Sequence, residues 1–302
     1  MRTPTLKAFA ATAVLALAVA GCGSSDEDES TAGAGTGTTA AKTTTVNDAA
    51  VAQLPADVKS KGTLTVAADA SYPPNEFFAE DGKTVIGLDP DLAQALGKAL
   101  GLKMEVQNAG FDGIIAGLQS GKYDLGMSSF TDNKEREEVV NFVTYLSAGT
   151  SFFVNAQKDT QVTDLASLCG KKVAVEKGTV QLDDATAQAK KCGGNKLTVL
   201  PYPDQNGANQ ALAAGRADVS MADSPVADYQ VKLSNGALKL AGTPYGTAPY
   251  GIAIPKNLKI EKALQTALKG LIADGTYQSI LDKWGLEKSA AVTEPVINGA
   301  QD

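Results

Sequence analysis

A short pattern that occurs twice constrains the fold of this chain more than any other feature of its sequence. Residues 118–127 and 212–221 each read Leu, two small or polar residues, Gly, a basic residue, any residue, Asp, an apolar residue, a small residue and Met. Gly121 and Gly215 suit the left-handed position just after a helix, and the apolar residues that follow each Asp are typical of short parallel strands. The pattern predicts two similar helix–strand units in an α/β protein.

A polar side chain follows each copy of the pattern two residues after its Met: Ser129 in the first copy and Asp223 in the second. Open α/β sheets bind their ligands at the carboxyl ends of the strands. Two such units that face each other would form a ligand-binding cleft. The alternative is a chance similarity between two ordinary αβ turns.

Composition removes several classes of function. The chain has a formal net charge of −7 and no histidine. Nucleic-acid binding is not expected, because it requires a basic patch that neutralises phosphates. The lack of histidine removes Ser-His-Asp and Cys-His catalysis and every His-ligated metal site. We also expect no catalytic residues, no metal and no cofactor.

The N-terminal region has the features of an export signal. Arg2 and Lys7 precede an apolar run that is shorter than the roughly 20 residues needed to span a bilayer. The small residues before Cys22 resemble the lipobox of bacterial lipoproteins, which implies a signal peptide over 1–21 and a lipid on Cys22. An ordinary signal peptide with an incidental cysteine is the alternative. Residues 22–55 are interpreted as a flexible tether that holds an extracytoplasmic domain at the cell membrane.

Beyond the tether, segments typical of helices and strands alternate in two series. Extended stretches at about 147–153 and 242–250 separate the series, and two extended crossovers are what a hinge between lobes needs. We predict the following division: lobe 1 at 56–148 and 247–288, lobe 2 at 149–246, and a loose tail at 289–302.

Three aspartates are expected to cap helices, because a side-chain acceptor satisfies the free N–H groups of the first turn. They are Asp89, Asp112 and Asp132. The helix that starts at Asp89 should end at Gly101, and Phe111 is expected to be exposed.

Cys169 and Cys192 remain once Cys22 is assigned to the lipid. In an exported protein, two such cysteines are more often bridged than free. Each follows a predicted helix and precedes a strand of lobe 2, so both belong to the same edge. We predict a disulfide; the alternative is two buried free thiols.

Four segments together resemble the polar-amino-acid binding proteins of ABC importers, the bacterial solute-binding protein family 3. They are GLDPDLAQALGKALG at 87–101, MSSFTDNKER at 127–136, EKGTVQ at 176–181 and MAD at 221–223. The resemblance implies a type II periplasmic-binding-protein-like α/β fold, in which two lobes joined by two hinge strands close on a ligand. It also implies an amino-acid ligand, a permease and an ATPase as partners, a monomer, and no enzymatic activity.

The resemblance assigns the two charged ends of an amino acid to particular residues. Arg136 would bind the α-carboxylate, with help from the backbone near Thr131 and at 178–180. Asp223 would bind the α-ammonium together with the Thr131 hydroxyl and the Ser129 carbonyl. The chemistry agrees, because a zwitterion needs one fixed cation and one fixed anion, and arginine offers a planar fork for a carboxylate. Arg136 could instead be a solvated helix residue, and Asp223 a helix cap.

For the ligand side chain, the resemblance implies a sandwich between Tyr72 and Phe111. It places Asp69 toward the far end, although Asp69 could instead only cap a loop. Asn75 stands before Glu76 where an aromatic residue is frequent, so the floor of the pocket departs from the family. The complete predicted set comprises Asp69, Tyr72, Phe111, Ser129, Thr131, Arg136, Thr179, Val180 and Asp223.

Two other functions fit the same fold: a periplasmic dehydratase-like enzyme, and a ligand-sensing receptor subunit. The enzyme would need a general acid beside a leaving group. The sequence does not fix the ligand, since Asp69, Glu76 and the acidic balance favour Arg or Lys but also accommodate glutamine.

Overall fold

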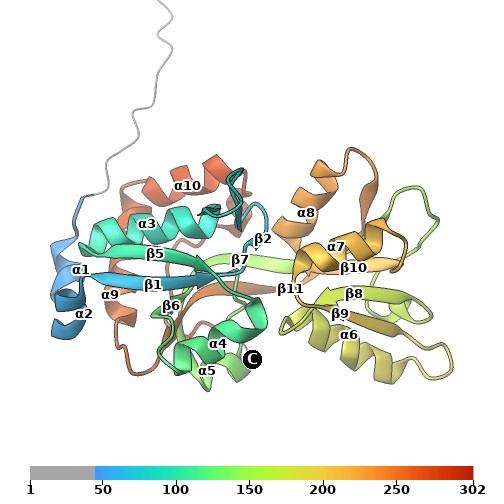
Figure 1. Cartoon of the computed structure of the whole chain (residues 1–302), viewed down its shortest axis with the longest axis horizontal. Coiled ribbons are helices and arrows are strands. Elements are labelled where there is room, and N and C mark those ends of the chain that lie inside the picture. The colour runs from blue at the N-terminus through green and yellow to red at the C-terminus, as the bar shows by residue number, and fades with distance from the viewer. Residues whose placement is uncertain (1–44, 302) are drawn as a thin grey trace, which may run out of the picture. The chain divides into compact units, whose positions relative to one another are not determined.

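The computed structural model describes residues 45–301, so the signal peptide, Cys22 and most of the predicted tether lie outside the described residues. The described chain forms an eight-stranded mixed sheet in the order β5-β1-β6-β11-β7-β10-β8-β9, and a small sheet β2-β3-β4. Figure 1 shows helices on both faces of the large sheet.

The strands of the large sheet are β1 (Thr63–Ala68), β5 (Lys103–Asn108), β6 (Leu125–Gly126), β7 (Val140–Asn155), β8 (Lys172–Glu176), β9 (Thr198–Tyr202), β10 (Val219–Asp223) and β11 (Leu238–Pro255). The small sheet consists of β2 (Ser71–Tyr72), β3 (Glu76–Phe78) and β4 (Val85–Ile86). The α-helices are α1 (Asp48–Ala52), α2 (Ala56–Lys61), α3 (Leu88–Leu100), α4 (Phe111–Gln119), α5 (Lys134–Glu137), α6 (Val180–Lys191), α7 (Gln205–Ala213), α8 (Ser224–Leu233), α9 (Glu261–Ala273) and α10 (Thr276–Trp284). Two 3₁₀ turns are η1 (Ala166–Leu168) and η2 (Lys288–Ala290).

The large sheet has two halves that are joined by long antiparallel strands. In lobe 1, β1 pairs in parallel with β5 and β6; in lobe 2, β8 pairs in parallel with β9 and β10. β7 and β11 pair with each other through both halves, and their register shifts near Tyr245, Ala248 and Tyr250. Both strands therefore carry the chain between the lobes where the sequence predicts extended crossovers.

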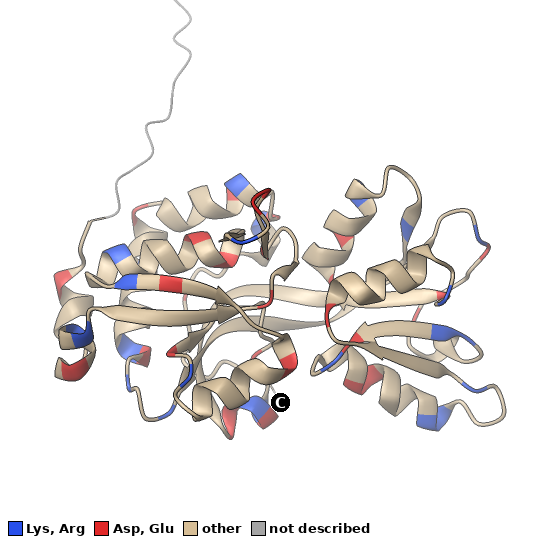
Figure 2. Ribbon diagram, in the orientation of Figure 1, with Lys and Arg blue, Asp and Glu red and all other residues tan. Residues whose placement is uncertain are grey.

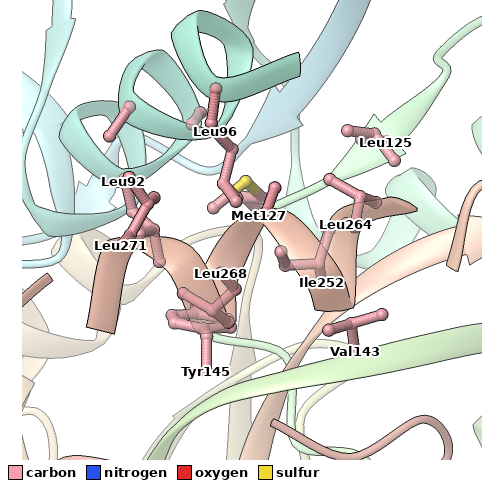
Figure 3. Close-up of a cluster of buried hydrophobic side chains, with 14 of the residues drawn as sticks. Leu92, Leu96, Leu125, Met127, Val143, Tyr145, Ile252, Leu264, Leu268 and Leu271 are labelled. Atoms are coloured by element: carbon pink, nitrogen blue, oxygen red, sulfur yellow. The ribbon is translucent and has the colours of Figure 1, made fainter. Parts of the chain in front are cut away.

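The largest core lies in lobe 1. Leu88, Leu92 and Leu96 recur every four residues on α3, so they share the face that packs against α9 and the sheet. Burying each leucine contributes about 1.5–3 kcal/mol. The residues labelled in Figure 3 belong to this core: Leu92, Leu96, Leu125, Met127, Val143, Tyr145, Ile252, Leu264, Leu268 and Leu271.

The repeated pattern forms the predicted helix–turn–strand units. Gly121 and Gly215 adopt φ values of 74° and 70° just after α4 and α7. Asp124 exchanges two hydrogen bonds with the backbone of Thr65 on the neighbouring strand β1. Asp218 makes the same pair of bonds with Lys172 on β8 (2.9 Å from the Lys172 N–H to Oδ2, and 2.8 Å from the Asp218 N–H to the Lys172 carbonyl). Each Asp therefore attaches its helix–turn–strand unit to a neighbouring parallel strand. This contact explains why both copies of the pattern contain an Asp at the same position.

The end of α3 is predicted correctly, but its start is not. Gly101 follows the helix with a φ of 65°. The helix begins at Leu88, so Asp89 lies in the first turn and is not the cap. Its carboxylate instead accepts hydrogen bonds from the Ser129 N–H (2.9 Å) and the Tyr145 hydroxyl (2.8 Å). Asp89 thus links three elements of lobe 1.

The two other predicted caps are also wrong. Helix α4 begins at Phe111, and Asp112 lies inside its first turn. Phe111 is buried, with only 5% of its surface exposed, so the expectation of an exposed ring is wrong. Helix α5 is capped by the side chain of Asn133. Asp132 accepts a hydrogen bond (2.7 Å) from the Gly299 N–H, far along the chain.

The predicted tether ends earlier than expected. Part of the range 22–55 forms α1, whose Ala50 is fully buried in the lobe 1 core. The Asn47 side chain caps this helix by accepting from the Ala50 N–H. Residues from about 47 onward therefore belong to the folded domain.

The tail expected to be loose at 289–302 is instead packed on lobe 1 as far as it is described. Ala291 and Ile297 form isolated antiparallel bridges with Leu146 and Val143 of β7. The β7 strand is buried on this side, and the tail satisfies backbone groups that would otherwise lack partners.

Cys169 and Cys192 form the predicted disulfide, with their Cα atoms 5.4 Å apart. The bridge links the end of η1 to the end of α6 in lobe 2. By chain-entropy estimates, closing a loop of this size contributes about 3 kcal/mol.

Candidate functional site

A pocket lies between the two lobes at the carboxyl ends of β6, β8 and β10. The pocket is narrow, since only about 10 Å³ of it can hold the centre of a water molecule. Its lining comprises Tyr72, Phe111, Ser129, Thr131, Arg136, Thr179, Val180, Gln181, Gln205, Ala222, Asp223 and Val226. The structure thus brings together every residue of the predicted set except Asp69.

Arg136 extends from lobe 1 to lobe 2. The Asn133 side chain accepts from the Arg136 N–H (2.9 Å) and fixes the single turn that carries it. The guanidinium donates to the Thr131 carbonyl (2.8 Å) in its own lobe and to the Gly178 carbonyl (2.9 Å) in the other. Burial lowers the pKa of Arg136, but arginine stays charged at any physiological pH. A fixed cation therefore bridges the lobes.

The first turn of α6 faces the same guanidinium from lobe 2. Thr179 caps this helix: its hydroxyl accepts from the Leu182 N–H (3.2 Å) and donates to the Glu176 carbonyl (2.8 Å). The next two residues, Val180 and Gln181, line the pocket at a helix start, where N–H groups have no acceptor within the helix. Such a helix start, together with a guanidinium, suits a carboxylate.

Aromatic rings form one wall of the pocket. Phe111 stacks on Phe130 with ring centroids 4.5 Å apart, and Tyr72 meets Phe111 edge-on at 5.8 Å. The Arg136 guanidinium lies 5.4 Å from the Phe111 centroid and 5.5 Å from that of Phe130. Phe111 is buried because it sits within this stack. Phe130 was missed in the sequence, although it lies directly beside Ser129.

Asp223 supplies the anion of the pocket. It stands at the N-cap position of α8, but its side chain makes no capping hydrogen bond. Oδ1 accepts instead from the Gln181 amide (2.7 Å), which also donates to the Thr150 hydroxyl (2.9 Å). Burial raises the pKa of Asp223 to about 6, and the charge of Arg136 acts in the opposite direction. Opposite charges therefore face the pocket from the two lobes.

Ser129 is held in place by buried acids of lobe 1. Its φ of 52° is unusual for a residue other than glycine, and its N–H donates to Asp89. Glu76 is fully buried, and its two oxygens accept from the hydroxyls of Ser128 (3.2 Å) and Ser129 (3.3 Å). Asn75 donates to the Ser129 hydroxyl (2.9 Å). Glu76 therefore lies inside lobe 1, and the expectation that it faces the ligand is wrong.

Asp69 lies behind the aromatic wall, with 4% of its surface exposed. One oxygen accepts from the Phe111 N–H (2.9 Å) at the start of α4. Burial raises the pKa of Asp69, and the negative charge of Asp204 adds to the effect. Asp69 thus accepts a hydrogen bond from the first residue of α4, and it does not line the pocket directly.

Charge elsewhere on the two lobes is mixed. Figure 2 shows acidic and basic residues interspersed over the helices of both lobes. Within residues 45–301, no cluster of three acidic or cysteine side chains could hold a metal ion. In the same part of the chain, no helix combines the length and the apolar character needed to cross a membrane.

Comparison with known proteins identifies the family. The chain belongs to the bacterial extracellular solute-binding proteins, family 3, whose family model matches residues 64–287. It is 36% identical over 251 residues to the arginine-binding protein ArgT of Corynebacterium glutamicum, with 82% of each chain covered. It is 31% identical over 229 residues to the L-cystine-binding protein TcyJ of Escherichia coli K12, with 75% of this chain and 84% of the relative covered.

A solved structure of an ancestral arginine-binding protein bound to glutamine aligns with a TM-score of 0.70 and 37% identity. The alignment covers 75% of this chain and 99% of that one. Together these matches confirm the predicted fold class and identify a binding protein rather than an enzyme. The family is one of extracellular proteins, in agreement with the predicted export.

Proposed function

We propose that this protein captures a polar amino acid in the pocket between lobes 1 and 2 and delivers it to the permease and ATPase of an ABC importer. The observation that carries the proposal is that Arg136 of lobe 1 and Asp223 of lobe 2 line one pocket. The ligands named for the relatives are arginine, cystine and glutamine. These differ in side chain and share only the α-ammonium and α-carboxylate, so a fixed cation and a fixed anion are what they need in common.

The two charged ends of the ligand would bind to opposite lobes. The α-carboxylate would accept from Arg136 and from the first N–H groups of α6 at Val180. The α-ammonium would donate to Asp223, with the Thr131 hydroxyl and the Ser129 carbonyl as further acceptors. The ligand side chain would then pass between the aromatic wall and lobe 2. Arg136 contacts both lobes. A ligand bound to Arg136 would therefore lie against both lobes and would favour their closed arrangement.

Arg136→Ala tests this proposal. A thermal-shift screen of the twenty amino acids first finds a ligand, since one at 100 times its Kd adds about 2.7 kcal/mol of stability. Removing one partner of a desolvated charge pair costs about 3–5 kcal/mol, so calorimetry should show binding weakened by roughly 10² to 10³ or more. Arg136→Lys should recover only part of the affinity, because an ammonium cannot make a bidentate contact.

Lys134→Ala is the matched control. Lys134 lies in the same short helix, but its side chain is 55% exposed and forms an ion pair with Glu137. Its removal should leave affinity unchanged. If Arg136→Ala binds the ligand within threefold of the parent protein, the site assignment fails.

We also propose that a lipid on Cys22 anchors the protein to the cell membrane. The small residues before this cysteine and the preceding apolar run support the proposal. Cys22→Ala should leave the protein soluble or unprocessed on membrane fractionation, whereas the nearby Ser24→Ala should not. Correct processing and unchanged membrane association of Cys22→Ala would contradict the anchor.

A further inference from the structure

The chain continues past the part that matches the family model, which ends at residue 287. The residues that follow cross lobe 1 and reach α5, the single turn that carries Arg136. Figure 1 marks this end of the chain beside α5. We call residues 296–300 the C-terminal strap. The strap contributes no residue to the lining of the pocket between the lobes, so its contacts need a separate explanation.

The C-terminal strap is fixed to the first half of β7. The Thr144 N–H donates to the Val296 carbonyl (2.9 Å), and the Val296 N–H donates to the Thr144 hydroxyl (2.8 Å). Asn298 forms two further hydrogen bonds with Phe142. Its side-chain oxygen accepts from the Phe142 N–H (2.8 Å), and its own N–H donates to the Phe142 carbonyl (3.0 Å). The strap therefore has a defined position along this strand.

The end of the strap contacts the Arg136 turn from both sides. The Gly299 N–H donates to Oδ2 of Asp132 (2.7 Å), which lies two residues before α5 begins. The Ala300 N–H donates to Oε1 of Glu137 (3.1 Å), the last residue of α5. Asp132 is only 2% exposed, so solvent is a poor substitute for the strap there. Two consecutive backbone N–H groups thus hold the acids on either side of Arg136.

The turn has few other means of keeping its position. Helix α5 has four residues, and none of them is buried. An isolated helix shorter than about 12 residues is marginal in water, so a single turn depends on its surroundings. Other bonds hold the chain just outside α5: the Asp132 N–H donates to the Pro249 carbonyl (2.8 Å), and the Lys256 ammonium donates to the Glu138 carbonyl (2.8 Å). The strap adds two bonds closer to Arg136.

Gly299 allows the strap to approach β7 closely. A Cβ atom at this position would lie 2.7 Å from the Cγ2 methyl of Thr144, a distance that real Cβ contacts do not reach. Thr144 is 3% exposed, and its hydroxyl is already bonded to Val296, so it has little freedom to move away. A side chain at residue 299 would therefore push the strap off β7 and away from Asp132.

We propose that the C-terminal strap positions Arg136 for the α-carboxylate of the ligand by fixing the α5 turn through Asp132 and Glu137. The inference rests on the proposed function, because it concerns the placement of the residue that binds the carboxylate. A guanidinium makes two parallel hydrogen bonds to a carboxylate only when its plane is correctly oriented. A looser turn should therefore cost affinity, although the strap itself does not line the pocket.

Gly299→Pro tests the inference in the full-length protein. Proline removes the N–H that donates to Asp132 and adds a Cβ that faces Thr144. L-arginine is the first probe, replaced by the tightest-binding of the twenty amino acids if the parent protein does not bind arginine. Calorimetry should show an affinity about tenfold lower than that of the parent protein.

Two variants of Asp132 examine the same hydrogen bond from its other side. Asp132→Ala removes the acceptor and should weaken binding about as much as Gly299→Pro. Asp132→Asn keeps an oxygen that can accept from the Gly299 N–H, so it should retain most of the affinity. Glu294→Ala is the matched control, because Glu294 lies just before the strap, is 64% exposed and pairs with Lys269. This control should leave the affinity unchanged.

A double-mutant cycle with Arg136→Ala separates positioning from general stabilisation of lobe 1. Without the guanidinium there is nothing for the strap to position, so Gly299→Pro should then change the affinity by less than about twofold. Amino acids are soluble enough for a thermal-shift titration to measure the weak binding of the Arg136→Ala proteins.

The outcomes separate the two proposals. If Gly299→Pro and Asp132→Ala both bind the probe within about twofold of the parent protein, the inference is overturned while amino-acid binding stands. Equal losses with and without Arg136 also overturn it, because the strap would then act on lobe 1 as a whole. If the parent protein binds no amino acid, both proposals fail. Melting curves check that each variant folds. If Gly299→Pro unfolds, the milder Gly299→Ala replaces it and should weaken binding about threefold or more.

Discussion

Glu76 and Asp89 in lobe 1 and Glu176 and Asp223 in lobe 2 have little access to solvent, but the two pairs of acids make very different hydrogen bonds. In lobe 1, Glu76 and Asp89 accept hydrogen bonds from serine hydroxyls, a backbone N–H and a tyrosine. In lobe 2, Asp223 accepts from the Gln181 amide, and neither carboxyl oxygen of Glu176 has a hydrogen-bond partner of good geometry among the described residues. Burial raises the pKa of all four. Asp89 links elements of lobe 1 through these hydrogen bonds, whereas Asp223 lines the pocket between the lobes.

Removing an acid from each lobe should produce opposite results. Asp89→Ala leaves two buried donors, the Ser129 N–H and the Tyr145 hydroxyl, without an acceptor. At about 1–3 kcal/mol for each unsatisfied group, urea unfolding should show a loss of roughly 2–6 kcal/mol. Asp223→Ala removes a poorly compensated buried charge, and the free energy of unfolding should change by less than about 1 kcal/mol.

Asp223→Ala should nevertheless weaken ligand binding by roughly 10² or more, because the α-ammonium loses its counter-charge. Asp89→Asn is the control for shape in lobe 1, since the amide oxygen can still accept from Ser129. It should recover most of the stability. Equal stability losses for Asp89→Ala and Asp223→Ala would show that the two pairs of acids do not differ in role.

The same contrast explains what the sequence could and could not predict. The repeated pattern predicted that Ser129 and Asp223 lie at strand ends. This prediction was possible because the helix, turn and strand of each unit are encoded by residues that are close together in the sequence. Glu176 also lies at a strand end, because it is the last residue of β8. The resemblance to the family, together with the opposite charges that a zwitterion needs, predicted that Arg136 lies in the same pocket.

The errors arose where a side chain finds its partner far along the chain. Asp89 and Asp132 look like caps, but they bond to Ser129 and Gly299, and no local pattern records those contacts. Phe111 is buried because it stacks on Phe130, which lies after β6 and outside the helix that contains Phe111. Glu76 could be assigned to the lobe 1 interior only once its serine partners were known.

The pair of repeat aspartates offers a finer comparison of the lobes, with a smaller expected effect. Asp124 and Asp218 make the same two-bond contact with a neighbouring strand, but Asp124 also pairs with Lys61. Loss of the side-chain bond to a backbone N–H should cost about 1 kcal/mol in each case. The Lys61 side chain is 52% exposed, and an exposed ion pair adds at most about 1 kcal/mol.

Urea unfolding of Asp124→Ala and Asp218→Ala should therefore give losses of about 1–2 and about 1 kcal/mol. Lys61→Ala removes the ion pair but not the hydrogen bond to Thr65, so it isolates the difference between the two sites. A double variant of Asp124 and Asp218 should show additive losses, because the residues lie in separate lobes and share no partner. Suppose instead that Asp218→Ala changed nothing while Asp124→Ala cost several times more than Lys61→Ala. The Asp would then fix the strand in lobe 1 alone, and the shared pattern would not mark a shared structural role.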